Sequence, residues 1–430
     1  MTSVTVGLLG CGIVGGALVE LIQERAEAIE IQTGITIQIG SVAVRSASKA
    51  RAGLDPSLLT TDARALVNDP SIDVVVEVIG GIEPARELIL DAIKAGKPVI
   101  TANKELLANC GAELYAAAAA AGVDLLFEAA AAGAIPIVRP LRESLLGEDI
   151  TRLMGIVNGT TNFILTRMSE DGADYADALA EAQRLGYAER DPTADVEGFD
   201  AGAKAAIMAS IAFGARVVAG DVYHEGISQV TQADIAFAQR LGYEIKLLAI
   251  AEVFEGATTG DREIGVRVHP AMVPADHPLA SVRDSFNAVF VEGAAAGEMM
   301  FYGRGAGGRP TASAVLGDLI DASLNRGQAS HRRVPGGDVA RIRPIDDLDS
   351  AYYLNLEVND SPGVLSQVAG VFGRHEVSIR SMEQEGLGAE ARLVFITHQA
   401  KERAIQATIE ELRSLEVVTG VRSFMRVIGA

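Results

Sequence analysis

Short apolar runs and helical periodicities alternate along the first 130 residues of the chain. Runs of Val, Ile and Leu predict β-strands, and apolar residues three and four apart predict amphipathic helices. Five strands are expected, at residues 4–9, 35–45, 74–79, 98–101 and 125–128. Helices are expected at residues 14–27, 83–95 and 105–121. Strands separated by helices pair in parallel through right-handed crossovers, so this segment predicts an α/β fold with a doubly wound parallel sheet.

The pattern changes beyond residue 133, where helices alternate with longer strand-like runs. Helices are expected at residues 176–185 and 201–218, and strands at residues 247–254, 263–268 and 288–292. These elements predict an α+β domain, which we place at residues 133–302. Helical periodicity returns at residues 311–324 after a run of glycines. We therefore assign residues 303–328, together with residues 1–132, to the first domain.

The last 80 residues follow the order strand, helix, strand, strand, helix, strand. The expected elements are residues 352–358, 363–375, 377–384, 391–397, 401–412 and 421–428. The βαββαβ order predicts a ferredoxin-like unit, which we place at residues 347–430. The segment before it is polar and basic and contains Pro and Gly, which predicts a linker at residues 329–346.

Composition indicates a folded protein of two or three domains and excludes some partners. A chain of 430 residues is longer than one hydrophobic core usually supports. The formal net charge of −20 argues against nucleic acid, because a surface that binds phosphates must be basic. The sequence offers neither a long uninterrupted apolar stretch nor a basic flank before an apolar run at its start. We therefore expect no membrane span and no export signal.

The cysteines and histidines do not indicate a disulfide or a transition-metal site. The two cysteines, Cys11 and Cys110, lie far apart, and the six histidines show no HExxH motif. A reducing cytoplasm is the simplest setting for this composition.

A glycine loop follows the first expected strand. Gly10, Cys11, Gly12, Ile13, Val14 and Gly15 together fit GxGxxG at the opening of a helix. Glycine is needed here because the turn is tight and a Cβ atom would keep a pyrophosphate away from the backbone N–H groups. With the predicted sheet, the loop indicates a Rossmann-like dinucleotide-binding domain.

The second expected strand ends at Arg45, where a ribose-binding carboxylate would be expected for NAD. A guanidinium can bind a 2′-phosphate in a fork, whereas a carboxylate would repel it. Arg45 therefore predicts a preference for NADP(H), with NAD(H) still possible. The alternative is that Arg45 is only a solvated residue at the end of a strand.

Two lysines stand where proton-transfer chemistry would need them. Thr101 closes the fourth strand, and Asn103 is a suitable N-cap that places Lys104 in the first turn of the next helix, at the sheet edge where ligands collect. Asp200 and Lys204 are four apart and so share a face of a largely uncharged helix. Burial would lower the pKa of such a lysine and a neighbouring carboxylate would raise it. Lys104 could instead be a surface lysine, Lys204 could extend to solvent, and the acidic loop before Asp200 could be an exposed turn.

Several motifs resemble those of homoserine dehydrogenases. The segment from Gly186 to Lys204 reads Gly-Tyr-Ala-Glu-x-Asp-Pro-Thr-x-Asp-Val-x-Gly-x-Asp-x-x-x-Lys. The glycine loop, residues 101–107, residues 155–162 and the glycine-rich segment at residues 303–318 match in the same order. The likeness covers the whole chain, and its last segment is similar to an ACT domain.

The resemblance implies a reaction and residue roles. A monofunctional enzyme would reduce L-aspartate 4-semialdehyde to L-homoserine with NAD(P)H, and reverse this, in threonine, methionine and isoleucine biosynthesis. Lys204 would exchange the proton with the substrate oxygen and Asp200 would orient it. Glu189 and Asp195 would hold the substrate amino group. Lys104, between nicotinamide and substrate, is the competing proton donor. Residues 133–302 would form the catalytic and dimerisation domain of a homodimer or homotetramer.

The resemblance also implies a monovalent cation, usually Na⁺, and a contact to the nicotinamide. The matching cation positions are Glu128 and the backbone carbonyls of Ala131, Gly133 and Ile135. A hard cation prefers such oxygen ligands. Gly307 would touch the nicotinamide end of the cofactor.

The ferredoxin-like unit contains a loop similar to the amino-acid-binding loop of ACT domains. Its residues are Asn359, Asp360, Gly363, Val364 and Leu365, between the first strand and helix. N–H groups at a helix start can receive a carboxylate, and Gly363 would allow close approach. The resemblance favours feedback inhibition by L-threonine. Alternatively, this unit serves only to join copies of the chain.

Two other functions remain to be distinguished. An aspartate-semialdehyde dehydrogenase would need a nucleophilic cysteine in its substrate domain, but both cysteines precede residue 111. A non-catalytic sensor of NADP and an amino acid would have no need for Lys104, Glu189, Asp200 and Lys204. Assay of homoserine-dependent NADP reduction separates the enzyme from the sensor.

Overall fold

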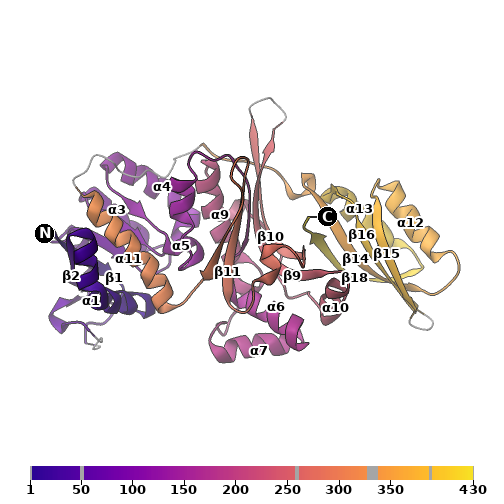
Figure 1. The fold of residues 1–430 in the computed structure, drawn as a ribbon, viewed down its shortest axis with the longest axis horizontal. Coiled ribbons are helices and arrows are strands. Elements are labelled where there is room, and N and C mark those ends of the chain that lie inside the picture. Colours follow the sequence, from indigo (N-terminus) through magenta and orange to yellow (C-terminus); the bar gives the residue numbers. More distant parts are fainter. Residues whose placement is uncertain (1, 49–52, 257–260, 327–337, 387–389, 430) are drawn as a thin grey trace. The chain divides into compact units, whose positions relative to one another are not determined.

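The computed structural model describes residues 2–48, 53–256, 261–326, 338–386 and 390–429 (Figure 1). The chain forms two compact units. The first contains Met1–Leu153, Gly202–Val222 and Phe286–Ala340, and the second contains Met154–Ala201, Tyr223–Ser285 and Arg341–Ala430. The division expected from the sequence, with a substrate domain at residues 133–302, stays a prediction, and residues 329–337 of its linker lie outside the described residues.

A six-stranded parallel sheet forms the centre of the first unit, as the sequence predicts. Its strand order is β3-β2-β1-β4-β5-β6. The strands are β1 (Thr2–Leu9), β2 (Ile35–Ala43), β3 (Leu59–Thr60), β4 (Val74–Glu77), β5 (Val99–Thr101) and β6 (Leu125–Leu126). This order reverses between β1 and β4, which is where doubly wound sheets bind dinucleotides. The two-residue strand β3 was not expected, because it is too short to show a period.

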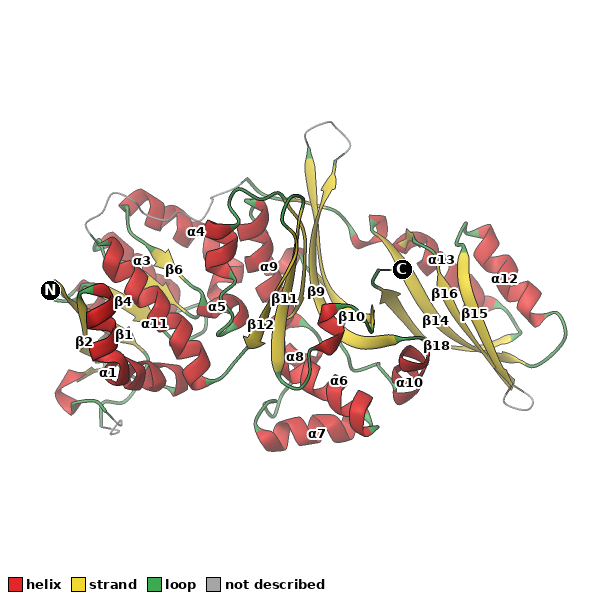
Figure 2. Ribbon diagram, viewed as in Figure 1, coloured by secondary structure: helices red, strands yellow, loops and turns green. Residues whose placement is uncertain are grey.

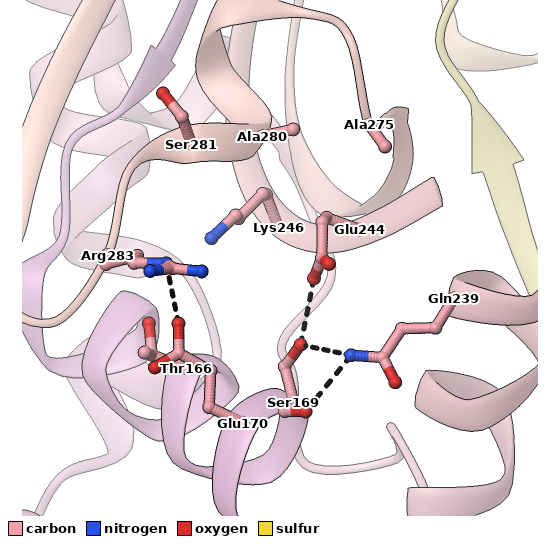
Figure 3. A pocket seen from close by; sticks show the side chains of 10 residues that line it. All are labelled: Thr166, Ser169, Glu170, Gln239, Glu244, Lys246, Ala275, Ala280, Ser281 and Arg283. Atoms are coloured by element: carbon pink, nitrogen blue, oxygen red, sulfur yellow. Dashed lines mark hydrogen bonds and ion pairs between the residues drawn. The ribbon is translucent and has the colours of Figure 1, made fainter. Parts of the chain in front are cut away.

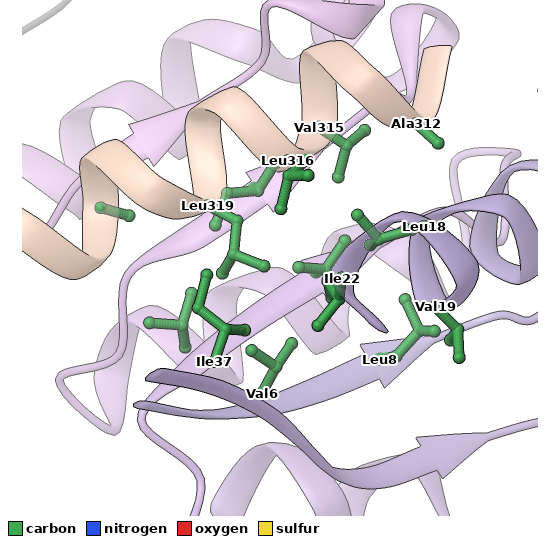
Figure 4. Close-up of a cluster of buried hydrophobic side chains, with 14 of the residues drawn as sticks. Val6, Leu8, Leu18, Val19, Ile22, Ile37, Ala312, Val315, Leu316 and Leu319 are labelled. Atoms are coloured by element: carbon green, nitrogen blue, oxygen red, sulfur yellow. The ribbon is translucent and has the colours of Figure 1, made fainter. Parts of the chain in front are cut away.

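Helices cover this sheet and complete its core. They are α1 (Ile13–Thr33), α2 (Ala63–Asn68), α3 (Ala85–Lys94), α4 (Lys104–Ala121), α5 (Ala129–Ala132) and, much later in the chain, α11 (Gly308–Asn325). Figure 4 shows that Leu18 and Ile22 of α1 and Leu319 of α11 meet Val6 and Leu8 of β1. Burying such a side chain stabilises the fold by roughly 1.5–3 kcal/mol. The late helix is therefore part of the first unit's core.

The first unit also contains an antiparallel hairpin of β11 (Phe286–Gly293) and β12 (Gly297–Arg304). Strand β7 (Ile150–Ile156) and helix α9 (Phe199–Phe213) each have residues in both units. Helix α9 ends earlier than the expected residue 218, because Gly214 adopts a left-handed φ of 63°.

A sheet also runs through the second unit, in the order β9-β10-β18-β14-β16-β15 (Figure 2). Its first two strands, β9 (Tyr243–Glu255) and β10 (Arg262–Pro274), are antiparallel. The last four belong to a ferredoxin-like βαββαβ segment, which confirms the predicted ACT-like fold. Its elements are β14 (Asp349–Asn359), α12 (Val364–Arg374), β15 (Ile379–Gly386), β16 (Glu390–Thr397), β17 (Ala400–Lys401), α13 (Glu402–Ser414) and β18 (Val418–Val427).

Four helices flank these strands: α6 (Gly159–Asp171), α7 (Tyr175–Leu185), α8 (Thr193–Val196) and α10 (Gln232–Arg240). Helix α6 escaped sequence analysis because its residues 160–166 and Met168 are all buried, so no polar face marks a helical period. Among the described residues no helix combines the length and apolar character needed to cross a membrane.

Candidate functional site

The three glycines of the loop after β1 have different surroundings. Gly10 has a φ of 99°, and a Cβ atom there would lie 2.8 Å from the backbone oxygen of Val78. A Cβ atom on Gly15 would lie 2.4 Å from the backbone oxygen of Gly10, so only glycine lets α1 approach the loop this closely. At Gly12 nothing lies within 4 Å. The first and last glycines shape the turn, and the middle one leaves space for a ligand.

The start of α1 is open to a ligand. Gly12 is the N-cap residue and provides no side-chain cap, and the side chain of Ile13 is 83% exposed. Because the first N–H groups of a helix carry positive partial charge, this end suits a pyrophosphate. Helix α11 also begins here: a Cβ atom on Gly308 would lie 2.8 Å from Cγ2 of Ile13. The structure thus brings Gly307 beside the glycine loop.

Arg45 lies at the same edge of the sheet. The N–H of Gly10 donates to the backbone oxygen of Ala43 at 3.0 Å, which joins the loop to the last residue of β2. Arg45 follows two residues later and its side chain is exposed. No acidic residue lies between Val44 and Ser48. The arginine is therefore positioned and accessible, as binding of a 2′-phosphate requires.

A buried carboxylate organises the ends of β4 and β5. Glu77 is fully buried and accepts hydrogen bonds from Oγ1 of Thr101 at 2.5 Å and from the N–H of Ile79 at 2.8 Å. The Thr101 hydroxyl accepts in turn from the N–H of Asn103 at 3.0 Å. Sequence analysis missed Glu77, although an acidic residue within a Val/Ile run was the available signal. Glu77 fixes the backbone from which Lys104 projects.

Asn103 caps α4, as the sequence predicts. Its Oδ1 accepts from the N–H of Leu106 at 3.1 Å, and its amide donates to the backbone oxygen of Gly81 at 2.6 Å. Lys104 is the first residue of the helix and its side chain is exposed.

Helix α4 lies beside helix α9, which carries Lys204. Both helices line a small cavity of about 30 Å³, with Leu107 from α4 and Ile207 from α9 in its wall. Leu107 follows Lys104 by three residues, and Ile207 follows Lys204 by three. Along each helix, the lysine therefore lies about one turn before the residue that lines the cavity. Lys204 is 8% exposed, which excludes the alternative that it extends to solvent.

Two predicted acidic residues share a hydrogen-bond donor. The side-chain amide of Asn158 donates to Oδ1 of Asp195 at 2.7 Å and to Oδ2 of Asp200 at 2.9 Å. Asp200, 8% exposed, lies in the first turn of α9. Asn158 is itself held as the N-cap of α6, where its Oδ1 accepts from the N–H of Thr161 at 2.9 Å. Sequence analysis quoted the motif around Asn158 but gave this residue no role.

Glu189 belongs to the segment between α7 and α8. Its side chain is exposed, and its backbone oxygen accepts from Nε2 of Gln183 at 3.0 Å. The segment is anchored at Tyr187, whose backbone oxygen accepts from Oγ1 of Thr160 at 2.7 Å and whose ring lies 4.9 Å from that of Phe163. The acidic segment is thus partly ordered by α6, and not simply a solvated turn.

Glu128 uses its carboxylate to hold a turn of the backbone. Oε1 accepts from the N–H groups of Ile137 and Val138 at 2.6 and 2.7 Å, and Oε2 accepts from that of Arg139 at 2.8 Å. Burial raises the pKa of Glu128, and these backbone hydrogen bonds oppose the shift. Asp318 accepts from the N–H of Glu128 at 2.7 Å, and burial raises the pKa of Asp318 to about 7.

This arrangement bears on the expected cation position. Gly133 is at a bend, with φ 63° and ψ −113°, and a Cβ atom there would lie 2.2 Å from the backbone oxygen of Gly305. Within the described ranges, no cluster of three acidic, cysteine or histidine side chains suited to a metal is found. The expected cation position, at Glu128 and the backbone oxygens of Ala131, Gly133 and Ile135, stays a prediction.

The loop between β14 and α12 has an open helix start. Gly363 is the N-cap of α12, with a φ of 90°, and no atom lies within 4 Å of where its Cβ would be. Val364 is buried and anchors the helix, whereas Leu365 is 37% exposed. Asn359 ends β14, and its N–H donates to the backbone oxygen of Val417 at 2.9 Å. With Asp360, which follows, these residues form an accessible loop.

A larger cavity, of about 410 Å³, lies elsewhere in the second unit. Figure 3 shows Lys246, Arg283, Glu170 and Glu244 around it. Arg283 pairs with Glu170 at 2.7 Å, so charges in this cavity compensate one another. None of the expected site residues lines it, and we assign the chemistry to the residues above.

Comparison with known proteins agrees with the motifs. Family models described as "Homoserine dehydrogenase", "Homoserine dehydrogenase, NAD binding domain" and "ACT domain" match residues 136–320, 10–128 and 352–417. A homoserine dehydrogenase of Corynebacterium glutamicum is 52% identical, over 99% of this chain and 96% of that protein. One from Mycobacterium tuberculosis is 50% identical, over 99% and 98%.

Solved structures give the same likeness. A crystal structure of a homoserine dehydrogenase from Thiobacillus denitrificans has a TM-score of 0.92 and 43% identity, covering 99% of this chain and 98% of that one. A hyperthermophilic archaeal homoserine dehydrogenase in complex with NADPH has a TM-score of 0.64 and 29% identity, covering 76% of this chain and all of that one.

Proposed function

The chain belongs to the homoserine dehydrogenase family of NAD(P)-dependent oxidoreductases, and from this premise we propose how its residues oxidise L-homoserine to L-aspartate 4-semialdehyde and catalyse the reverse reduction. One observation carries the proposal: Asp200 and Lys204 are buried one turn apart on α9, and Asn158 joins Asp200 to Asp195. A pair of carboxylates suits an ammonium group, and a buried lysine suits a reacting oxygen.

Lys204 removes the hydroxyl proton in the oxidation and returns it to the carbonyl oxygen in the reduction. Its ammonium form also stabilises negative charge that develops on that oxygen. Asp200 orients Lys204 from one turn earlier on the same helix. A bound nicotinamide cofactor would supply the hydride-transfer chemistry between the carbinol carbon and the aldehyde.

Glu189 and Asp195 bind the substrate's ammonium group, with Asn158 fixing the position of Asp195. Lys104, at the start of α4, would contact both the substrate and the nicotinamide. We assign it a binding role, because its side chain is exposed whereas that of Lys204 is buried. A desolvated lysine has the more readily tuned pKa and is the better proton donor.

The cofactor binds at the loop formed by Gly10, Cys11, Gly12, Ile13, Val14 and Gly15, with Thr101, Lys104 and Gly307 near its nicotinamide end. NADP(H) is preferred over NAD(H), because Arg45 is exposed at the edge of the sheet and no carboxylate is close in sequence. One archaeal relative of known structure was solved with NADPH, which supports this preference.

A monovalent cation, Na⁺ in the first instance, binds backbone oxygens of Ala131, Gly133 and Ile135 beside Glu128. The bend at Gly133 supports this, since it turns successive carbonyls out of the helical direction. The cation would hold the segment that leads out of the parallel sheet.

The ferredoxin-like segment binds L-threonine as a feedback inhibitor in the threonine, methionine and isoleucine pathways. The open start of α12 at Gly363 offers N–H groups for its carboxylate. Strand β15 forms one edge of the sheet and its side chains are largely exposed, which supports pairing between copies in a homodimer or homotetramer. We place the chain in the cytoplasm, the reducing setting that its two distant cysteines favour.

An enzyme assay tests the proposal. The purified chain should reduce NADP⁺ when L-homoserine is added, and should oxidise NADPH when L-aspartate 4-semialdehyde is added. L-Threonine, which keeps the α-amino acid but moves the hydroxyl, serves as the control substrate and should give no comparable rate. Binding of NADPH without turnover of homoserine would favour the sensor instead.

A further inference from the structure

Arg426 of β18 is fully buried between two carboxylates. Its exposed fraction is 1%. Towards Glu402 it donates from Nε at 2.9 Å and from Nη2 at 2.7 Å, and towards Glu225 it donates from Nη1 at 3.1 Å and from Nη2 at 3.0 Å. An arginine that binds two carboxylates in a fork on each side fixes both of them in place.

The two carboxylates come from different parts of the second unit. Glu402 begins α13 of the ferredoxin-like segment and also accepts from the Tyr352 hydroxyl at 3.0 Å. Glu225 follows β8 (Tyr223–His224), which pairs with β10, outside that segment. Strand β18 itself continues the sheet beside β10 (Figure 2). In this pairing Arg426 is opposite Ala271. Arg426 is therefore the charged link between the ferredoxin-like segment and the stretch around Glu225.

That stretch packs against residues adjacent in sequence to the two aspartates of the candidate site. The N–H of Ile227 donates to the backbone oxygen of Val196 at 2.8 Å, and Val196 follows Asp195. The ring of His224 lies 4.3 Å from that of Phe199, which precedes Asp200.

Gly226 shows how tight this packing is. A Cβ atom there would lie 2.3 Å from the backbone oxygen of Val196 and 2.7 Å from Cα of Glu197. The backbone of residues 224–227 cannot shift toward α8 without moving it. A displacement of Glu225 is therefore transmitted to the residues next to Asp195 and Asp200.

We propose that Arg426 and Glu225 are positioning residues of the substrate site, through which the ferredoxin-like segment sets the affinity for the substrate's ammonium group. Arg426 holds Glu225, which belongs to residues 224–227, and these residues contact Val196 and Phe199, the neighbours of Asp195 and Asp200. The inference rests on the proposed role of Asp195 as an ammonium-binding residue.

The link also works in reverse, since coupling between two sites is reciprocal. Substrate bound at Asp195 and Asp200 favours the arrangement in which Glu225 reaches Arg426. A ligand of the ferredoxin-like segment that moves β18 or α13 away from this arrangement would weaken substrate binding. Such a ligand would raise KM for homoserine and leave the cofactor loop unaffected.

Steady-state kinetics of Glu225→Gln in the full-length protein test the inference. Gln keeps the shape and a hydrogen-bond acceptor but removes the charge that pairs with Arg426. We expect KM for homoserine to rise roughly tenfold, with KM for NADP⁺ and kcat changing much less. The matched control is Glu411→Gln, which removes a carboxylate paired with Arg374 in the same segment at 2.5 Å but has no contact with Glu225. Its KM for homoserine should match that of the parent.

Two further variants distinguish a wrong positioning role from a wrong assignment of the substrate site. Arg426→Lys keeps one charge but loses the fork, and should give an intermediate KM. Asp195→Asn reports on the ammonium site itself. If Asp195→Asn raises KM and folded Glu225→Gln does not, the positioning role is overturned while the proposed function stands. If Asp195→Asn leaves KM unchanged, the assigned substrate site is wrong and the positioning role is overturned with it.

Discussion

Replacing Lys246 by methionine should change how the stability of the protein depends on pH. Lys246 lies on β9 at the cavity of Figure 3 and is 4% exposed. Its Nζ donates to the backbone oxygen of Val282 at 2.6 Å. Burial lowers the pKa of Lys246 to about 8, an effect that Glu244 and Glu170 oppose and Arg283 reinforces.

The direction and size of the expected change in the free energy of unfolding follow from proton linkage. In the folded protein the lysine loses its proton near pH 8, whereas in the unfolded chain it keeps it until about pH 10.4. Between these values the unfolded state binds more protons, so the free energy of unfolding rises with pH. The difference between these two pKa values corresponds to on the order of 3 kcal/mol. Below pH 8 the penalty for holding a buried ammonium group is present in full.

Denaturant unfolding of the parent and of Lys246→Met at several pH values between 7 and about 10 measures this. The stability of the parent relative to the variant should increase across that range, while contributions from other groups cancel in the difference. Lys94→Met, at an exposed position of α3, is the control for loss of a charge alone. A difference between parent and Lys246→Met that does not vary with pH would refute the reasoning.

Three further changes test the cofactor and effector sites. Gly15→Ala places a Cβ atom 2.4 Å from the oxygen of Gly10, so it should abolish NADPH binding, measured by titration calorimetry, or prevent folding; unaltered affinity would contradict the loop geometry. Arg45→Ala should raise KM for NADP⁺ about tenfold and leave KM for NAD⁺ unchanged, since one charge-assisted contact to a phosphate is lost; an unchanged ratio of the two constants would remove the basis for the NADP preference. Gly363→Val, which blocks the open start of α12, should abolish inhibition by threonine without changing kcat. Inhibition equal to that of the parent would place the effector elsewhere. The point variant is preferable to deleting the ferredoxin-like segment, because deletion would leave Glu225 without Arg426.

Much of the fold could be predicted from local pattern. The parallel sheet, most of its helices and the ferredoxin-like order follow from strand and helix periods alone. The same pattern does not show α6, because residues 160–166 are all buried and give that part of the helix no exposed face. It also does not show that β18 continues the sheet beside β10. Pairing between strands that are far apart in sequence depends on the tertiary structure and has no signature in the local pattern.

Some residues of the candidate site could likewise be predicted from the sequence, and others could not. Motif spacing predicts the glycine loop, the N-cap Asn103 and the pair Asp200 and Lys204. Asn158 and Arg426 were missed because each acts through partners far away in the sequence, whereas Glu77 was missed although it interrupts a run of Val and Ile. An amide that joins two carboxylates, or an arginine that joins two glutamates, is recognised only once the fold brings its partners together.

The turnover number of Lys204→Ala tests the central claim most directly. The account predicts that kcat for homoserine oxidation falls by about 10²–10⁴, while the affinity for NADPH stays near that of the parent. Lys246→Met, which removes a buried lysine outside the site, should keep the parent's kcat. A folded Lys204→Ala protein that turns over homoserine within a few-fold of the parent would contradict the assignment of Lys204 as the proton-transfer residue.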